Sequence, residues 1–504
     1  MTTQVFNKFS LIALLALLIT GVRLQAQVTT SSINGKVRDA KGLPIPGASV
    51  QLINTATGTK YGSQTSLDGF FRLNNLNPGG PYRLTVTFIG YNKQEKVNIN
   101  LSLGADLRQD FVLTDEGQQL TEVKVSGTRG GTKMGSGTRI GEEQIKTLPS
   151  LSRSLTDVTR LTPQGSKDNS FVGTNFRYNN VTIDGAINND AIGFSPSLGG
   201  QSGSSGMPGS STRTNPVSLD AIQDVQVLLA PYDVKIGNFT GGSVNAVTRG
   251  GTNDFKGSVY GYGRNASMIG KNKIGDGAKL PSSYHDYQTG FRLGFPIIKD
   301  KLFFFTNEEI TRRQDPVILA AGSADMPVIN RTQAQQIVDY MKSAYGIDPG
   351  SYDNYNIYAK SNKFFNRLDW NINDKNQLTI RNNTITSTAT NLERDQSNFR
   401  FSGIDYKQTN NQSSTVAELK SRFNNSVSNS LVAGYSSIHD FRDPISSASL
   451  PQIEIASNGG TIYLGTDREA SIFNMKQKTF EFTDNLTYNT GKHTFTFGTH
   501  NELY

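Results

Sequence analysis

The chain has 504 residues, with 50 Lys and Arg against 42 Asp and Glu, a formal net charge of +8 and no Cys. A length above the ~100–200 residues of one domain predicts at least two folded units. The lack of Cys excludes disulfides, thiolate metal sites and Cys nucleophiles. Because the basic residues are spread singly among Asn, Gly and Thr, we expect no nucleic-acid partner.

Residues 1–26 have the pattern of a secretory signal peptide. Lys8 precedes an apolar run over residues 9–20, which is too short for the ~20 residues of a spanning helix. Cleavage is expected after Ala26, in the sequence LQAQ. Other apolar stretches are shorter than a membrane span, so a membrane role would have to use strands.

Residues 27–113 predict a small β-sandwich. Short alternating runs such as INGKVRD, ASVQLIN and YRLTVTFIGY are separated by turn residues at Lys41-Gly42 and Asp68-Gly69. The sequences GKVRDAKGLPIPGASV and TSLDGFFRLNNLNPGGPYRLTVTFIGY resemble the carboxypeptidase regulatory-like domain. That resemblance implies a transthyretin-like or Ig-like sandwich without catalytic residues of its own, acting as an accessory module.

Residues 114–134 form a polar linker with one short apolar alternation. It consists of Leu120, Thr121, Glu122, Val123, Lys124 and Val125. This segment is either the first strand of the next unit or a strand that pairs with the exposed sheet edge of another protein. It resembles the TonB box of outer-membrane receptors, and that resemblance implies TonB as a partner.

Residues 135–253 predict an α+β unit. Apolar residues recur at helical spacing, which predicts an amphipathic helix that ends at Pro163; they are Leu148, Leu151, Leu155, Val158 and Leu161. Further along, FRYNNVTIDGA predicts a strand pair. The segment AIQDVQVLLAPYDVKIGNFTGGSVNAVTRGGTN predicts a strand, a loop and a second strand.

An ordered set of residues in this unit resembles the plug domain of TonB-dependent receptors. The set includes Asp184, Gly185, Pro231, Gly237, Gly241, Gly242, Asn245 and Arg249. The resemblance implies a plug inside a barrel, with residues 237–249 locking the plug into the barrel wall. Residues 188–214 are rich in Gly and Ser, which favours a flexible loop. By resemblance to plug apical loops, this loop would contact an external ligand.

From residue 254 onward the sequence predicts antiparallel strands with one apolar face. In residues 287–297, YQTGFRLGFPI, the odd positions are apolar or Thr and the even positions are polar or small. A soluble sandwich would show the same alternation. The links decide between the two architectures, because the short links IIKD, DKN, NNSVSN and NTGK alternate with long polar ones. That sorting is typical of a transmembrane barrel with periplasmic turns and external loops.

The strands are expected at residues 255–264, 285–296, 301–312, 361–373, 377–387, 414–424, 430–441, 476–488 and 493–503. One long link carries a helix candidate, TQAQQIVDYMKSAY. Tyr287, Trp370, Tyr435 and Tyr488 are candidates for interfacial aromatic girdles. Because ~22 strands are needed to enclose a plug, we expect an incomplete barrel and a natural protein that continues past Tyr504.

Common catalytic motifs are absent from the sequence. The sequence has no GxxxxGKS/T loop, no HExxH and no GxSxG. The His residues at 285, 439, 493 and 500 fall on separate predicted strands or loops, and the oxygens around Asp184 lack the spacing of a Ca²⁺ loop. We therefore expect no enzyme, no catalytic residue, no cofactor and no metal site.

The expected fold is mainly β: a β-sandwich over residues 27–113, an α+β plug over 135–253 and the first strands of a transmembrane antiparallel β-barrel over 254–504. The resemblance, particularly to Oar-like receptors of the Bacteroidetes type, implies an outer-membrane receptor that admits a surface-bound solute by TonB-driven plug displacement. Its partners would be TonB with its inner-membrane complex, outer-membrane lipid and an unidentified extracellular ligand. Two alternatives on the same architecture stay open, an adhesion or surface-organisation protein and a protein-export conduit.

Overall fold

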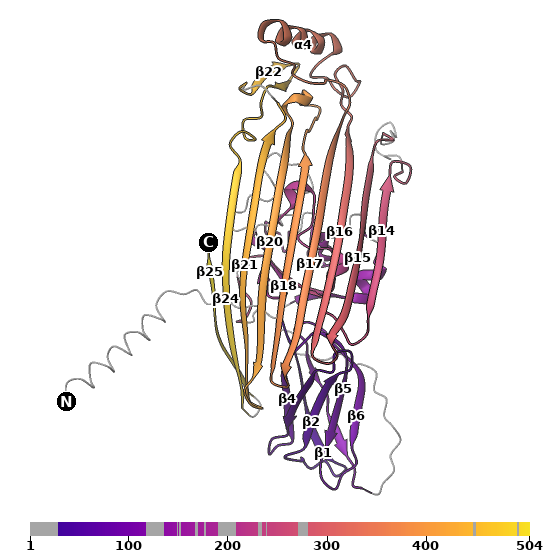
Figure 1. Cartoon of the computed structure of the whole chain (residues 1–504), viewed down its shortest axis with the longest axis vertical. Coiled ribbons are helices and arrows are strands. Elements are labelled where there is room, and N and C mark those ends of the chain that lie inside the picture. Colours follow the sequence, from indigo (N-terminus) through magenta and orange to yellow (C-terminus); the bar gives the residue numbers. More distant parts are fainter. Residues whose placement is uncertain are drawn as a thin grey trace, which may run out of the picture.

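The computed structural model describes residues 29–116, 136–148, 150, 153–166, 170–175, 178–189, 208–229, 234–237, 239–270, 281–446, 450–490 and 493–504. These residues form a β-sandwich, a plug and a large curved sheet (Figure 1). The mainly-β prediction is confirmed. The domain limits given above stay a prediction.

The sandwich is built from two facing sheets. The first has the order β4 (Phe70–Leu76), β1 (Ser31–Asp39) and β7 (Asp106–Arg108), with β8 (Phe111–Leu113) also paired to β1. The second has the order β3 (Lys60–Gln64), β2 (Ser49–Asn54), β5 (Gly79–Thr87) and β6 (Gln94–Leu101). Alternate side chains of both sheets, such as Ile33, Leu52 and Leu84, form one buried core, as expected for a sandwich. Strand β3 was not predicted, because KYGSQ has little apolar character.

The plug contains a five-stranded sheet with two short helices. The order is β11 (Ala186–Ile187), β10 (Asn180–Ile183), β13 (Gly242–Thr248), β12 (Ile222–Leu229) and β9 (Ser136–Gly141). Strand β13 is buried along its whole length, and β10 and β12 flank it within the sheet. The predicted strand pairs at residues 180–187 and 222–248 are confirmed.

The predicted amphipathic helix over Leu148–Leu161 is wrong in extent. Helix α2 (Glu142–Thr147) ends before Leu148, and α3 (Leu155–Thr159) has only 5 residues. A Ser154–Asp157 capping box starts α3, and Arg153 just before it has a left-handed φ of 48°. The spacing of the Leu residues therefore arises from two separate segments.

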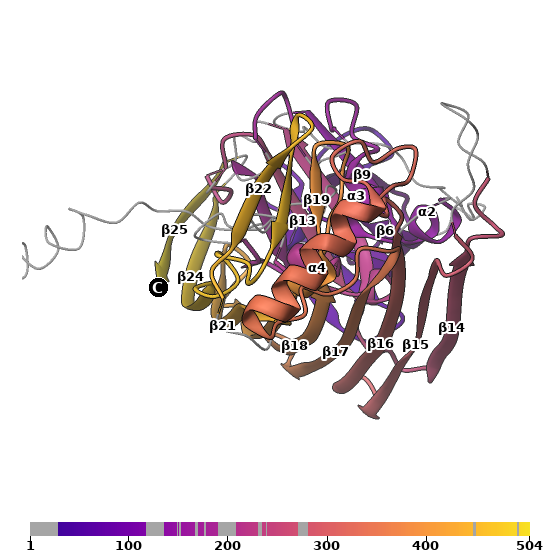
Figure 2. The same ribbon diagram turned by 90° about the horizontal axis from the view of Figure 1, so that it is seen from above.

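The large sheet has nine antiparallel strands. Their order is β14 (Lys256–Asn265), β15 (His285–Ile298), β16 (Leu302–Val317), β17 (Tyr355–Asn373), β18 (Asn376–Thr390), β20 (Tyr406–Arg422), β21 (Val427–Pro444), β24 (Asn474–Thr490) and β25 (His493–Leu503). All nine predicted strands are present. In the part of the chain that the structure describes, β14 and β25 are the two edges, so this sheet is an open, curved segment that wraps around one side of the plug (Figure 2).

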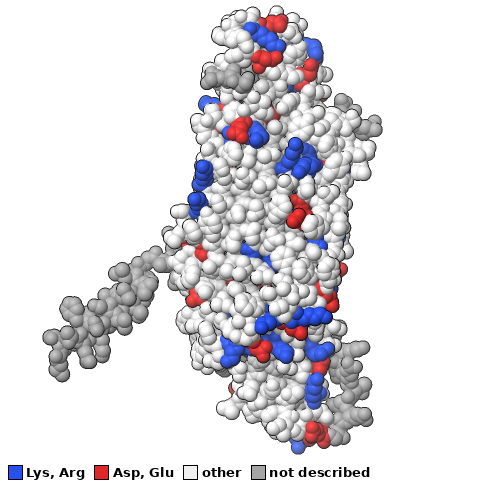
Figure 3. Space-filling view, viewed as in Figure 1, with Lys and Arg blue, Asp and Glu red and all other residues white. Residues whose placement is uncertain are grey.

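The strands present an apolar face outward and a polar face toward the plug. Register places Glu309, Lys363 and Gln412 on the plug side of β16, β17 and β20, where all three are buried. Along the strands, the residues between these plug-facing positions point the other way, and many of them are large apolar side chains that are exposed. Those side chains include Val259, Phe291, Ile310, Phe364, Ile380, Phe480, Phe482 and Phe497. Exposed apolar side chains on most of the strands fit a lipid-facing surface. Charged groups are sparser over the middle of the wall than at its base (Figure 3).

The two ends of the sheet differ in the way the sequence predicts. Short turns and the sandwich lie at one end, and the long links lie at the other (Figure 1). The link between β16 and β17 carries α4 (Arg331–Tyr345), which confirms the predicted helix. A small sheet of β19 (Asn398–Arg400), β23 (Gly460–Leu464) and β22 (Ile453–Ser457) lies beside it. Among the described residues, each helix is too short or too polar to cross a membrane.

Tyr287, Trp370, Tyr435 and Tyr488 all point outward, with 37–46% of each side chain exposed. Trp370 and Tyr488 lie near the short-turn end of their strands, and Tyr287 lies near the opposite end of β15. Tyr435 instead lies near the middle of β21, against Phe480 at 4.7 Å between ring centroids. Tyr435 is therefore part of the apolar wall.

Candidate functional site: the plug and its contacts

Asp184 lies where the plug meets the barrel wall. The Asp184-Gly185 turn joins β10 to β11 with left-handed φ angles of 46° and 77°, which Asp and Gly tolerate better than other residues. The Asp184 carboxylate accepts hydrogen bonds from the Thr248 amide at 2.8 Å and the Thr248 hydroxyl at 2.6 Å. It also forms ion pairs with Arg381 at 3.2 Å and Arg367 at 3.6 Å, on the barrel strands β18 and β17.

The two arginines hold other parts of the plug as well. Arg381, whose side chain is 3% exposed, donates to the Ile183 carbonyl. Arg367 donates to the Thr248 carbonyl at 3.1 Å and is itself held by Asp369 at 2.8 Å. One carboxylate and two guanidinium groups therefore join the end of β10, the end of β13 and two barrel strands.

Further polar contacts hold the plug along the wall. Buried Glu309 accepts a hydrogen bond from the plug residue Ser218 at 2.7 Å and pairs with Lys363 at 2.8 Å. Near the end of the sheet that carries the long links, Arg213 of the plug pairs with Asp315 at 2.6 Å and donates to the Thr390 carbonyl at 2.8 Å. Other such contacts are Ser211 with Asp440, Thr212 with Ser387, the Asn383 amide with the Pro216 carbonyl, and the Ile187 amide with Glu481.

Apolar contact between plug and wall is more limited. The buried plug core is formed by plug side chains, to which the barrel adds Phe305 and Phe365. A second small cluster joins Ala186 to Val416 and Val432. When two polar surfaces separate, water can replace the hydrogen bonds that are lost. Separating apolar surfaces instead costs ~25 cal/mol for each Å² that becomes exposed to water. The plug is therefore a separately packed body with a largely polar contact to its wall.

The other predicted plug residues hold the plug together internally. The Gly237 carbonyl accepts a hydrogen bond from the Asn180 side-chain amide at 2.8 Å. A Cβ on Gly241 would lie 2.1 Å from the Thr174 hydroxyl, and one on Gly242 would lie 2.8 Å from the Phe171 ring. These glycines are needed because neighbouring side chains occupy the space of a Cβ.

Asn245 and Arg249 also stay within the plug. Asn245 is buried on β13, between Thr182 and Gln226 in register. Arg249 pairs with Glu142 of α2 at 2.5 Å. Burial alone would raise the pKa of Glu142, but the ion pairs with Lys146 and Arg249 lower it to about 2. The structure thus brings Arg249 to α2, and the wall contact next to it is made by Thr248. Their role as a lock stays a prediction.

Two sets of predicted site residues lie outside the described residues. They are the TonB box candidate Leu120–Val125 and Pro231 of the plug motif. Most of the Gly- and Ser-rich loop over residues 188–214 lies outside as well, but its last part carries Ser211, Thr212 and Arg213, which contact the wall.

The link from plug to barrel passes closely over the base of the wall. A Cβ on Gly251 would lie 2.6 Å from the Phe304 carbonyl oxygen and 2.9 Å from the Phe303 Cβ. A Cβ on Gly250 would lie 2.8 Å from an Asp369 carboxylate oxygen. The GG pair in TRGGTN is therefore explained by close packing, which the sequence alone did not reveal.

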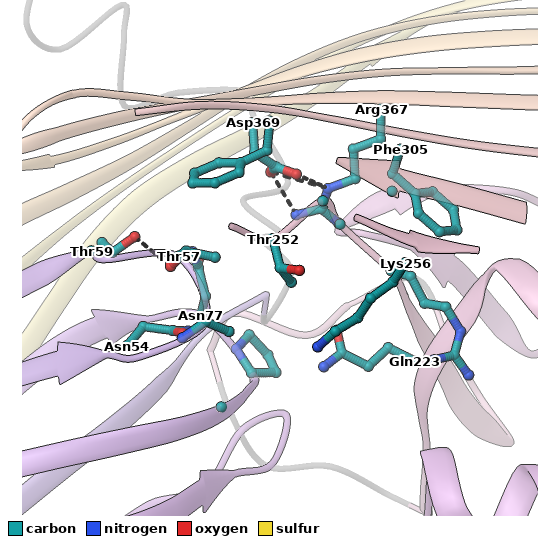
Figure 4. A pocket seen from close by; sticks show the side chains of 18 of the residues that line it. Asn54, Thr57, Thr59, Asn77, Gln223, Thr252, Lys256, Phe305, Arg367 and Asp369 are labelled. Atoms are coloured by element: carbon teal, nitrogen blue, oxygen red, sulfur yellow. Dashed lines mark hydrogen bonds and ion pairs between the residues drawn. The ribbon is translucent and has the colours of Figure 1, made fainter. Parts of the chain in front are cut away.

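The sandwich docks on this same link and leaves a cavity of about 330 Å³ between sandwich, plug and barrel (Figure 4). Thr59 accepts a hydrogen bond from Asn371 of β17 at 2.9 Å, and the Ala56 carbonyl accepts the Asn253 amide at 2.8 Å. Lys420 of β20 donates to Asn77 at 2.7 Å. Figure 4 shows Lys256 and Gln223 on the plug and barrel side of this cavity, facing Asn54 and Asn77 of the sandwich.

A buried ion pair within the plug forms hydrogen bonds to the backbone of the sandwich residue Leu103. Asp224 of β12 pairs with Arg139 of β9 at 3.2 Å. Asp224 accepts a hydrogen bond from the Leu103 backbone amide at 3.4 Å, and Arg139 donates one to the Leu103 carbonyl at 3.0 Å. Burial raises the pKa of Asp224 to about 6, despite the opposing effects of Arg139 and of the Leu103 hydrogen bond. Burial also lowers the pKa of Arg139. Desolvation thus outweighs the attraction within this pair.

Among the described residues, no three His, Asp or Glu side chains lie together in an arrangement that could hold a metal ion.

The sequence matches two domain families. Residues 32–114 match the carboxypeptidase regulatory-like domain, and residues 247–324 match an outer membrane beta barrel domain. The chain is also 28% identical over 387 residues to the TonB-dependent transporter Oar of Myxococcus xanthus, which covers 71% of this chain and 34% of that protein. The matched region thus resembles a TonB-dependent transporter, and the two matched domains are an N-terminal regulatory-like domain and part of an outer membrane beta barrel. The predicted resemblance and the outer-membrane location are confirmed.

Two solved structures align with most of this chain at low sequence identity. The siderophore receptor PirA from Acinetobacter baumannii aligns with a TM-score of 0.46 and 18% identity, covering 73% of this chain and 48% of that one. The outer membrane transporter YddB from Escherichia coli aligns with a TM-score of 0.46 and 14% identity, covering 71% and 47%. The chain spans about a third of the length of the curated relative and about half of these two structures.

Proposed function

We propose that this chain acts in a TonB-dependent outer-membrane receptor, which binds a solute at the cell surface and admits it to the periplasm when the plug is displaced. The observation that carries the proposal is the nature of the plug contact. The plug has its own apolar core, yet buried ion pairs and hydrogen bonds such as those of Asp184, Glu309 and Arg213 hold it to the wall. Such a contact can open by exchanging protein partners for water.

The chain connectivity supports a mechanical route to that opening. The TonB box candidate lies between the sandwich and β9, the first strand of the plug sheet. In the described part of the sheet order, β9 is an edge strand paired with β12. A pull on residues 120–125 would therefore act first on an edge strand. Peeling an edge strand breaks backbone hydrogen bonds in sequence, which takes less force than shearing the whole sheet at once.

The test is binding of the purified TonB C-terminal domain to the full chain in detergent. We expect binding that Val123→Pro abolishes, since Pro removes a backbone donor from any strand pairing. Thr128→Pro, outside the candidate box, is the matched control and should bind normally. If the wild-type chain and a peptide spanning Gln118 to Thr128 both fail to bind, the adhesion alternative is favoured. Accumulation of an exported protein in the periplasm of a deletion strain would favour the export conduit.

A further inference from the structure

The external tip of the molecule is a small body with its own core. Helix α4 packs across the sheet β19-β23-β22, and Val338, Met341, Phe399 and Ile462 are among its buried side chains. It stands at the end of the barrel sheet opposite the sandwich (Figure 1). The tip therefore has a buried core separate from that of the plug.

An apolar groove of about 770 Å³ runs between α4 and β22, which lie side by side (Figure 2). One face of α4 supplies Ile337, Tyr340, Met341 and Tyr345, and the opposite side is formed mainly by β22 and the residues before it. Tyr340 and Tyr345 are 62% and 58% exposed. A groove of ~300–1,000 Å³ with aromatic and aliphatic walls is typical of a binding site.

One wall of the groove is a strand with a free edge. In the part of the chain that the structure describes, β22 pairs with β23 and with no other strand. The Asn458-Gly459 turn that joins them has left-handed φ angles of 44° and 76°, as in a two-residue hairpin. In such a hairpin the flanking residues Ser457 and Gly460 form a hydrogen-bonded pair.

Alternation along the strand then fixes where the other backbone groups point. Ile455 and Ile453 bond to β23, while the N–H and C=O groups of Glu454 and Ala456 point to the free edge. Thr461 of β23 lies opposite Ala456, and its amide donates to the Ser397 carbonyl instead of bonding to β22. This agrees with the assignment of Ala456 to a pair that is not hydrogen-bonded. The free edge thus offers a row of partial positive and negative charges beside an apolar groove.

We propose that this groove binds an extended peptide segment that joins β22 as an added strand and places alternate apolar side chains in the groove. A peptide backbone carries the complementary row of N–H and C=O partial charges, which a compact apolar molecule or a helix does not present. The five residues of β22 offer an edge of ~17 Å, enough for a segment of similar length. This inference is independent of the proposed transport function.

The test uses the full chain in detergent and fluorescence anisotropy. The probe is the labelled heptapeptide Thr-Val-Thr-Ile-Thr-Val-Thr, and its matched control is the same peptide methylated on alternate backbone nitrogens. Methylation removes donors without removing apolar side chains. We expect saturable binding of the first peptide and about tenfold weaker binding of the peptide methylated along its pairing edge, since hydrogen bonds with β22 are lost.

The matching change on the protein is Ala456→Pro. It removes one donor at the free edge and leaves the hairpin bonds of Ile455 and Ser457 in place. We expect about tenfold weaker binding, with Ala456→Ser close to wild type. Tyr340→Ser should also weaken binding, because it removes a wall of the groove. The methylated peptide keeps the test decisive should Ala456→Pro disturb the hairpin.

Three results would overturn the proposal. The first is no saturable binding of the unmethylated peptide up to about 1 mM. The second is equal binding of both peptides, since that would indicate an apolar ligand site without backbone pairing. The third is self-association of the chain that Tyr340→Ser abolishes, since a second copy would then occupy the groove.

Discussion

At the scale of single residues, Asp184 combines two roles that are usually separate. Its backbone takes the left-handed φ of a tight turn, and its carboxylate neutralises Arg381 and Arg367 of the barrel wall. The sequence pointed to Asp184 through its resemblance to a plug motif. It could not reveal the two arginines, because they lie on strands some 180 residues further along the chain and no local pattern links them.

We predict that Asp184→Asn loosens the plug. Asn keeps the turn geometry, but Arg381 is left buried without its carboxylate, a change that costs up to ~3–5 kcal/mol. Asp184→Ala should cost more, because it also loses the Thr248 hydrogen bonds and favours the left-handed φ less. Protease cleavage within the plug of the detergent-solubilised chain measures the effect. Asp254→Asn, at a carboxylate that is 75% exposed, is the control and should cleave at the wild-type rate.

At the scale of elements, hydrophobic alternation predicted the barrel strands but underestimated their length. Strand β20 begins at Tyr406 rather than 414, and β16 ends at Val317 rather than 312. The added residues lie at the strand ends next to the long links, where sequences such as YKQTNNQ lack an apolar alternation. Alternation reports which residues face lipid, and strands that continue beyond the bilayer are held by backbone pairing that leaves no such signal.

The close packing of the Gly250-Gly251 link likewise could not be predicted from the sequence. We predict that Gly251→Ala destabilises the folded chain by ~1–3 kcal/mol, because its Cβ would meet the backbone oxygens of Phe304 and Phe295 at 2.6 and 3.0 Å. Backbone atoms of a paired strand cannot move aside as a flexible side chain could. Gly270→Ala is the matched control, since a Cβ there meets nothing within 4 Å. Equal urea midpoints for the two variants would contradict the close packing.

At the scale of the whole molecule, the sequence predicted a sandwich, a plug and barrel strands, with short turns at one end of the barrel sheet and long links at the other. It did not predict where the sandwich docks. Loop sorting follows from local link lengths. Docking depends on scattered polar residues, such as Thr59 with Asn371 and Asn77 with Lys420, which carry no recognisable pattern in the sequence. The docked sandwich covers the base of the plug–barrel junction, so its release is coupled to any movement there.

We predict that this docking weakens as pH rises. Burial raises the pKa of Asp224 to about 6 in the docked state, against ~3.9 for a free Asp. At a pH between these two values, Asp224 is therefore protonated in the docked state and ionised when it is free. Stability gained from that proton is fully present below pH ~4 and is lost as pH rises through about 6. The loss is at most ~3 kcal/mol, and smaller if Asp224 stays partly buried after release.

The chain's lack of Cys makes this measurable, because Thr59→Cys would be the single thiol and lies buried at the docked surface. Labelling by a thiosulfonate reagent, normalised at each pH to the unfolded chain, should be slow at pH 4 and faster at pH 7. Asp224→Asn stays neutral throughout, so its labelling should vary little with pH. If the pH dependence persists in Asp224→Asn, another group controls the junction. If labelling is flat with Asp224 intact, the carboxylate ionises without loosening the contact, and the buried Arg139 pair must then be strong enough to hold the sandwich in both charge states.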